Sequence, residues 1–392
     1  MRISRLDKTV RPGLGALLAT TLIGLLAAPA SEAADVYLVA KAFDKNLPDG
    51  TSLRMWGFAE DADGDLNTDD GEAATAPGPV LSVPAADAGL TIHLRNDLAV
   101  PTSVIVPGQQ TTDNPVMFND AQGRQRVRSF VHETAPGAIS SYSYPALRPG
   151  TFLYQSGTHP ALQVQMGLAG AGVKDAAAGE AYPGVVYDHE VILVYSEIDP
   201  ALQAAVADGS YGTPAYPSTV DYRPRYFLIN GQTYDPNAPP LDAGTAGQTV
   251  LLRFVNVGLK THAPMLQRQW VEMIAEDGHP YSRPRPQTSL MVAAGQTRDA
   301  LWTPPAAVET VVWDRRLYLT DAGAAPGGMQ VRLQVVPPGA QTLERRETEL
   351  RALERPALER RSAPRELAPA SAAERDQAPS AERRLERLPE QR

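Results

Sequence analysis

Oxygen-bearing side chains recur between residues 61 and 72 at a spacing that suits a hard cation. In DADGDLNTDDGE they fall at loop positions 1, 3, 5, 7, 9 and 12, which are the ligand positions of an EF-hand calcium loop. Loop position 6 is Leu66, where the sharp turn calls for glycine, and the flanking segments have strand patterns instead of helix patterns. The sequence therefore predicts either a calcium site or an acidic hairpin loop. The predicted calcium ligands are Asp61, Asp63, Asp65, Asn67, Asp69 and Glu72.

Three of the six histidines lie beside a proline or a turn, where a β-fold would gather them. They are His132, His159 and His262. Imidazole binds copper, zinc and iron, and Met166 would add a soft ligand suited to copper. No HxH or HxxxH spacing joins any two of the three, so each also fits an ordinary hydrogen-bonded histidine at a turn. A copper site built from them is an alternative interpretation.

The chain contains no cysteine. Disulfides, zinc–sulfur and iron–sulfur sites, cysteine nucleophiles and blue copper all require this residue and are excluded. The sequence also lacks a nucleophile elbow, a Walker loop, a dinucleotide fingerprint and an HExxH helix. No catalytic residue is therefore assigned from the sequence.

The N-terminal residues, 1–34, have the organisation of a signal peptide. Four basic residues precede or adjoin the apolar stretch 14–28, and small residues follow at the positions that a signal peptidase reads. We therefore expect a protein exported by the Sec route, secreted or periplasmic, with no transmembrane segment in the mature chain. The net charge of −9 gives it no general attraction to nucleic acid.

From residue 35 to about residue 338, short apolar runs alternate with clusters of Pro, Gly, Asn and Asp. In TVLLRFVN, the side chains of Val250, Leu252 and Phe254 are expected on one face of a strand. Turn signals about every ten residues predict an all-β protein of two sandwiches. Only PALQAAVAD, residues 200–208, has a helical pattern. The predicted sandwiches cover residues 35–178 and 179–339, and the Arg/Glu/Pro/Ala-rich tail, 340–392, is predicted to be disordered.

Motifs along residues 50–338 resemble the first two domains of the multicopper oxidase family. The first half contains PGPVLSV (77–83), LTIHLRNDL (90–98), PTS (101–103), GTFLY (150–154) and MGLAG (166–170). The second half contains FLING (227–231), LRFVN (252–256), VEMIAEDG (271–278) and AGQTRD (294–299), which resemble the copper-free middle domain. The resemblance implies two cupredoxin-like Greek-key sandwiches.

The resemblance also implies where copper ligands would lie. The family's two HxH pairs correspond to Ile105 with Pro107 and to Gln155 with Gly157, and none of these four residues is histidine. We therefore expect a protein that keeps the framework, has lost the usual copper centres, and acts as a non-catalytic binding or scaffold protein. Its partner would be another protein or further copies of itself. The alternative is a divergent copper-dependent oxidoreductase that uses the three histidines named above.

Overall fold

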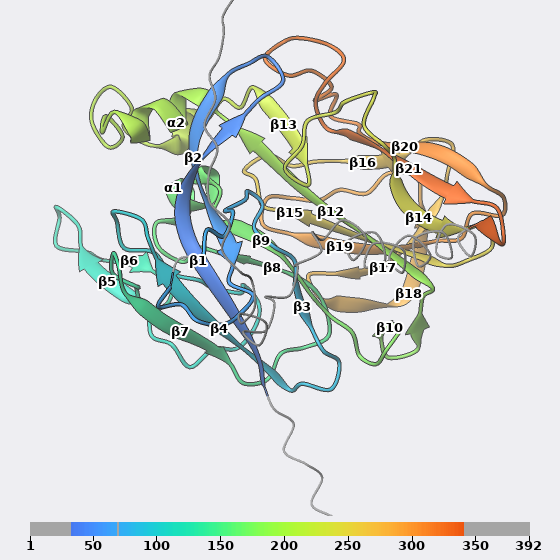
Figure 1. Ribbon diagram of the computed structural model, residues 1–392, viewed down its shortest axis with the longest axis horizontal. Helices are drawn as coiled ribbons and strands as arrows, with labels where there is room; N and C mark the ends of the chain where they lie inside the picture. Colours follow the sequence, from blue (N-terminus) through green and yellow to red (C-terminus); the bar gives the residue numbers. More distant parts are fainter. Residues whose placement is uncertain (1–32, 69, 341–392) are drawn as a thin grey trace, which may run out of the picture. The chain divides into compact units, whose positions relative to one another are not determined.

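The computed structural model describes residues 33–68 and 70–340 (Figure 1). The predicted signal peptide and charged tail lie outside the described residues except at their inner ends, and so does Asp69. The described residues up to Pro338 belong to one compact unit. Strands dominate them, and the described helices are short, so the predicted all-β cupredoxin-like fold is confirmed. No helix among the described residues is long and apolar enough to cross a membrane.

The first half forms a sandwich around its own apolar core. One sheet has the order β2-β1-β4-β7, the other has the order β3-β9-β8, and β5 pairs with β6 in a separate hairpin. Leu38, Ile92 and Phe152, which come from both sheets, pack into this core. The elements are β1 (Ala33–Asn46), β2 (Ser52–Glu60), β3 (Leu81–Val83), β4 (Gly89–Asn96), β5 (Val116–Asn119), β6 (Gln125–Ser129), β7 (Ile139–Tyr144), β8 (Gly150–Gln155), α1 (Pro160–Met166) and β9 (Ala169–Lys174).

The second half forms a larger sandwich. Its sheets have the orders β13-β12-β15-β19-β17-β18 and β14-β21-β20-β16. The helix predicted at residues 200–208 is α2, while α1 was not predicted. The elements are β10 (Glu180–Tyr182), β11 (Val185–Val186), β12 (His189–Ile198), α2 (Pro200–Ala207), the 3-10 helix η1 (Thr219–Asp221), β13 (Tyr226–Ile229), β14 (Leu241–Thr245), β15 (Val250–Asn256), β16 (Pro264–Leu266), β17 (Val271–Glu276), β18 (His279–Gln287), β19 (Thr297–Trp302), β20 (Val308–Asp314) and β21 (Gln330–Val336).

The two halves repeat the same strand pairing. β1 runs parallel to β4 in the first half, as β12 does to β15 in the second. β4 and β15 each end in a buried asparagine that closes the following turn. Asn96 Nδ2 donates to the carbonyls of Val100 and Thr134, and Asn256 Nδ2 donates to those of Lys260 and Val292. The motifs that end in these residues, LRN and RFVN, therefore mark equivalent strands.

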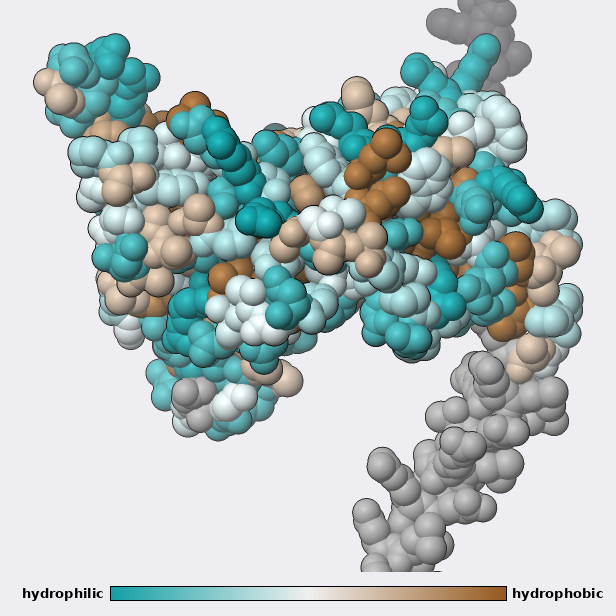
Figure 2. All heavy atoms as spheres, turned by 90° about the horizontal axis from the view of Figure 1, so that it is seen from above, coloured by the Kyte–Doolittle hydropathy of each residue, from teal (hydrophilic) through white to brown (hydrophobic). Residues whose placement is uncertain are grey.

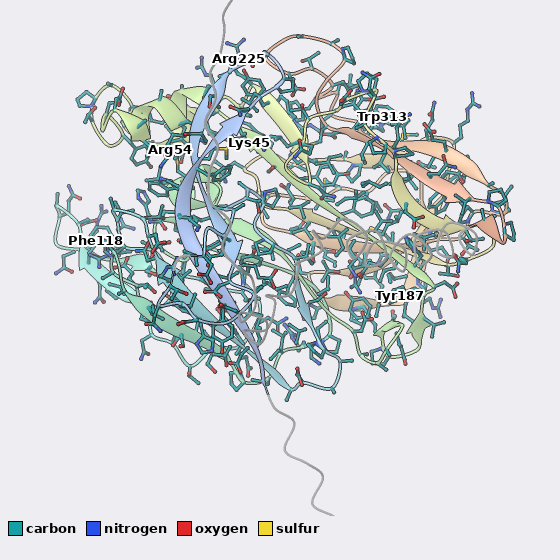
Figure 3. The ribbon with its side chains drawn as sticks, viewed as in Figure 1. Lys45, Arg54, Phe118, Tyr187, Arg225 and Trp313 are labelled. Atoms are coloured by element: carbon teal, nitrogen blue, oxygen red, sulfur yellow. The ribbon has the colours of Figure 1, made fainter. Side chains whose placement is uncertain are left out.

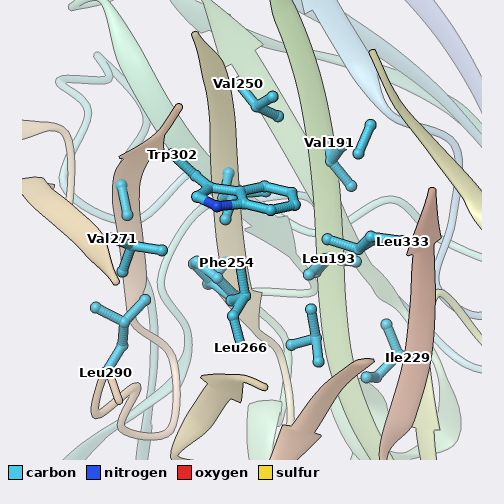
Figure 4. Packing of buried hydrophobic residues seen from close by; sticks show 14 of the residues in the cluster. Val191, Leu193, Ile229, Val250, Phe254, Leu266, Val271, Leu290, Trp302 and Leu333 are labelled. Atoms are coloured by element: carbon cyan, nitrogen blue, oxygen red, sulfur yellow. The ribbon is translucent and has the colours of Figure 1, made fainter. Parts of the chain in front are cut away.

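β15 is buried along its whole length. Val250, Leu252 and Phe254 face the core of the second sandwich, as their alternation predicts (Figure 4). Val255, on the other face, packs with Leu153 of β8 and with residues of β9 and β12. One face of the larger sheet thus covers the smaller sheet of the first sandwich. β15 packs into the core of the second sandwich on one side and against β8 and β9 on the other.

Arg253 lies on the face of β15 that meets β8, and its side chain is fully buried. Its guanidinium forms ion pairs with Glu190 and with Asp175, the latter at 2.8 Å. Nη1 donates to Thr151 Oγ1 on β8 at 3.0 Å, and Thr151 Oγ1 donates to Asp299 Oδ1 at 2.6 Å. Burial would lower the pKa of Arg253, but the carboxylates outweigh this effect and raise it. The cluster joins the sheets of the two halves.

Two tyrosines enclose this cluster. The Tyr182 hydroxyl donates to Asp299, and the Tyr187 hydroxyl donates to Asp175 Oδ2 at 2.6 Å. The Tyr187 ring also lies 5.9 Å from the guanidinium of Arg253, and Figure 3 places it near β10. Asp299 and Asp175 therefore each have a further partner besides Arg253, while the Glu190 side chain is 28% exposed.

We expect Arg253→Met to destabilise the protein strongly. Removing one partner from a buried ion cluster leaves carboxylates uncompensated, which costs about 3–5 kcal/mol. Arg54→Met is the matched control: Arg54 pairs with Asp44 at 3.1 Å on the surface (Figure 3), where a pair contributes about 0–1 kcal/mol. Urea unfolding at neutral pH measures both. The deficit of Arg253→Met should shrink at acidic pH, and equal stabilities of the two variants would contradict a structural role for the cluster.

Candidate functional site

The positions equivalent to the family's copper-ligand pairs come together in the first half. Ile105 and Gln155 exchange two backbone hydrogen bonds, with N–O distances of 2.7 and 2.9 Å. A Cβ at Gly157 would lie 3.4 Å from Ile105 Cγ2. The structure therefore brings the two segments together, as a shared metal site would require. The side chains found there are those of an isoleucine and a glutamine, beside a glycine.

The space around Gly157 is already filled. A Cβ at this position would lie 3.1 Å from Ser103 Oγ and 3.3 Å from Val131 Cγ2, which is closer than most Cβ contacts. A histidine at residue 157 would need its neighbours to move, because packing in protein interiors leaves few voids. A metal ligand at residue 157 would therefore require its neighbours to repack as well as a different residue.

A buried amide–hydroxyl network occupies the layer beneath these positions. Thr102 Oγ1 and Ser156 Oγ both donate to Gln163 Oε1, at 2.7 and 2.6 Å. Gln163 Nε2 donates to the carbonyl of Pro101 at 2.9 Å. Gln163 comes from α1, so the helix that the sequence did not predict supplies the centre of the network.

A second set of hydroxyls continues the network. Ser103 Oγ lies 2.9 Å from Thr158 Oγ1 and 3.2 Å from Ser129 Oγ. All three residues are buried. The groups are neutral at ordinary pH, and each has a partner within the network, so they can hold the loops in place without a metal ion.

His132 and His159 lie in different surroundings within the first half. The His132 ring stacks on Tyr142 at a centroid distance of 4.4 Å, and its Nδ1 lies 3.3 Å from Asp113 Oδ1. His159 begins α1 in a left-handed conformation, and its Nε2 lies 3.4 Å from the Tyr211 hydroxyl. Partial burial lowers the pKa of His159, so its imidazole is neutral at pH 7.

His262 is buried in the second half between two buried carboxylates. Its Nδ1 lies 2.8 Å from Asp314 Oδ2, and its Nε2 lies 3.3 Å from Glu197 Oε2. Glu197 Oε1 also accepts from the backbone N–H groups of Leu259 and Lys260. Burial alone would lower the pKa of His262, but the bonds to Asp314 and Glu197 outweigh it and raise that pKa. Both ring nitrogens are therefore engaged in holding turns together.

The structure thus does not assemble His132, His159 and His262 into one site. Each has its own protein partners, and among residues 33–68 and 70–340 no group of three or more His, Asp or Glu side chains is arranged to hold a metal ion. Asp314 and Glu197 are the partners that sequence reasoning missed. Asp314 is the last residue of β20, and Glu197 is the penultimate residue of β12. An acidic residue near the end of an apolar strand was the sequence signal that pointed to them.

Two protein cations organise the acidic loop. Lys41 Nζ lies 3.0 Å from Glu72 Oε2, and Arg95 Nη2 lies 3.9 Å from the same oxygen. Arg95 Nη1 also donates to the loop carbonyls of Leu66, at 3.2 Å, and Thr68. Glu72, one of the predicted calcium ligands, is therefore paired with Lys41, and the carbonyls of Leu66 and Thr68 face Arg95. The described part of the loop does not support the calcium prediction.

The other described acidic residues cap turns within the loop. Asp61 Oδ1 accepts from the Gly64 N–H at 3.0 Å, and Asp63 Oδ1 accepts from the Asp65 N–H at 2.9 Å. Asp65 Oδ1 accepts from the backbone and side-chain nitrogens of Asn67. Burial, together with the neighbouring Asp63, raises the pKa of Asp61. These contacts describe an acidic hairpin loop, which was the second interpretation of the sequence.

Comparison with known proteins agrees with this architecture. The family model for multicopper oxidase matches residues 195–312, and no curated protein matches the sequence. A blue copper oxidase from Nitrosomonas europaea has a TM-score of 0.60, with 16% identity over 77% of this chain and 85% of that one. The chain has a multicopper oxidase-like cupredoxin fold.

Two further solved structures extend the likeness. The multicopper oxidase mgLAC has a TM-score of 0.60, with 18% identity over 78% of this chain and 86% of that one. Copper nitrite reductase from Nitrosomonas europaea has a TM-score of 0.55, with 19% identity over 78% of this chain and 94% of that one. At these identities the likeness concerns the fold and does not transfer copper chemistry.

Copper does not fit the residues present at the family's ligand positions. Imidazole and thiolate are the side chains that hold redox-active copper. Here Ile105 and Gly157 offer no donor atom and Pro107 has no donor in its ring. Gln155 offers only an amide oxygen, a poor substitute for imidazole, and the chain has no cysteine. The neighbouring hydroxyls are neutral and bonded to one another, so they do not supply the missing copper ligands at this multicopper oxidase-like site.

We expect the stability of the protein to depend on pH through His262. Because its folded pKa lies above the ordinary value of about 6.5, the protonated ring contributes its full stabilisation below that value. The contribution disappears as the pH rises through the raised folded pKa. The difference in unfolding free energy between wild type and His262→Gln, measured between about pH 5 and pH 9, should therefore decrease as the pH rises. A difference that stays constant would contradict the assigned charge.

We expect calcium and chelator to give the same melting temperature, because Lys41 already pairs with Glu72. A cation at hundredfold excess over its Kd would add about 2.7 kcal/mol, which a melting curve resolves easily. Glu72→Gln should lower the melting temperature equally in both conditions. A calcium-dependent rise in the wild type that is lost in Glu72→Gln would restore the calcium prediction.

Proposed function

We propose that the chain is an exported, non-catalytic binding or scaffold protein that keeps a multicopper oxidase-like framework. The observation that supports this most directly is the bridge between Ile105 and Gln155 at the family's ligand positions. An aliphatic side chain and a packed glycine stand where imidazoles would be needed, above a network of neutral hydroxyls. Such groups stabilise loops but do not hold copper in a redox centre.

The alternative, a copper-dependent oxidoreductase using three histidines, draws no support from their contacts. His262 would have to leave two buried carboxylates, and the unpaired charges would then be costly. His132 is stacked on Tyr142 beside Asp113, and His159 lies beside Tyr211. Gathering them would require breaking contacts in both halves of the protein.

Export and the type of partner are part of the proposal. The basic residues, the apolar stretch and the small residues of the N-terminal sequence support passage through the Sec route. A body with no cysteine folds in an oxidising compartment without forming disulfides. The partner would be a protein, further copies of this chain, or a ligand held by the framework.

The proposal predicts no oxidase activity even when metal is supplied. The full chain is purified after growth with added copper and iron, and its metal content and dioxygen uptake with phenols are measured. We expect copper well below one ion per chain and no uptake above buffer. Retention of stoichiometric copper with dioxygen consumption, lost in a variant with alanine at His132, His159 and His262, would establish the oxidoreductase instead.

A further inference from the structure

The face seen in Figure 2 carries small, separate apolar groups within a mainly polar surface. A different arrangement exists beside α1, where apolar side chains from several elements line one pocket, which we call the α1 pocket. It has a volume of about 580 Å³, within the range of about 300–1,000 Å³ typical of small-molecule sites. Its aromatic lining consists of Trp56 of β2, Phe118 of β5, which Figure 3 shows on the β5–β6 hairpin, and Phe130.

The α1 pocket is open to entry, and its wall at Phe130 is hydrogen-bonded to the segment that begins α1. Phe118 and Phe130 are 45% and 51% exposed, so removing them from water would favour a ligand that covers them. Phe130 N donates to the Gly157 carbonyl at 3.1 Å, and His159 N donates to the Arg128 carbonyl at 3.0 Å. These bonds attach the base of the hairpin to the start of α1. This part of the pocket is therefore held in place by the fold itself, which reduces the entropic cost of binding.

The charges at the α1 pocket cancel. Arg128 pairs with Glu133 on the wall, and the lowered pKa of His159 leaves its imidazole neutral at pH 7. Gln163 and Thr158 use their polar atoms within the buried network. The pocket thus presents aromatic and aliphatic surface together with one neutral imidazole, and no uncompensated charge to attract an ion.

We propose that the α1 pocket binds an uncharged, largely apolar aromatic molecule. Planar rings suit the faces of Trp56, Phe118 and Phe130, and an ionised group would lose its hydration without gaining a counter-charge. The site adjoins the buried hydroxyl network beside the family's ligand positions, since Thr158 and Gln163 belong to both. The inference rests on the proposed binding function and names its site and class of ligand.

The test uses the full-length protein and a neutral fluorescent probe, N-phenyl-1-naphthylamine. We expect saturable binding at one probe per chain. Phe130→Ser should weaken binding roughly tenfold or more, because it removes the apolar ring surface that the probe would cover. Ala161→Trp, on the exposed side of α1, should block the pocket. Trp270→Ser is the matched control, because Trp270 is 67% exposed and does not line the pocket.

Thermal melts establish that each variant is folded, and the anionic probe 8-anilinonaphthalene-1-sulfonate should bind more weakly than the neutral one. Equal binding by wild type, Phe130→Ser and Ala161→Trp would overturn the site. Tighter binding of the anionic probe would overturn the class of ligand. Absence of probe binding, with a dimer that Phe130→Ser dissociates, would show that a second copy covers this face and would also overturn the proposal. None of these results depends on copper content. The proposed binding site can therefore be wrong while the proposed lack of oxidase activity is right, and the oxidase proposal can be wrong while the binding site is right.

Discussion

The burial of β15 on both faces is the constraint on which the body depends. One face closes the core of the second sandwich, and the other packs on β8 and β9 of the first. A charged residue on such a strand must be fully paired, because an isolated charge away from water is too costly. Arg253 meets this requirement through Asp175, Glu190 and Thr151, which lie before β12, on β12 and on β8. The ion cluster therefore fixes the two halves against each other without a disulfide.

A second consequence concerns the loops at Ile105 and Gln155. In a metalloprotein, a metal ion can hold such loops and contribute to folding. Here backbone pairing and the hydroxyl network centred on Gln163 hold them instead. Neutral hydrogen bonds of this kind contribute about 0.5–1.5 kcal/mol each and require no supply of metal. These contacts can thus hold the loops with no imidazole at the four ligand positions.

Much of the fold could be predicted from the sequence because strand periodicity and turn residues are local signals. The alternation around Phe254 and the helix at residues 200–208 are examples. Helix α1 was missed because seven residues beginning with proline carry little periodicity. The acidic ladder predicted either a calcium site or a loop, and its spacing could not show that Lys41 and Arg95, from distant strands, contact it. The roles of Arg253 and His262 likewise depend on partners far away in sequence, which spacing alone cannot reveal.

Copper electron paramagnetic resonance tests whether this framework can hold copper as a redox centre. The full chain receives one equivalent of Cu(II) and is then passed through a desalting column. We expect the eluted protein to have almost no copper signal, because its imidazoles are separate and engaged with other residues. A stoichiometric signal with nitrogen hyperfine structure from several imidazoles would contradict it.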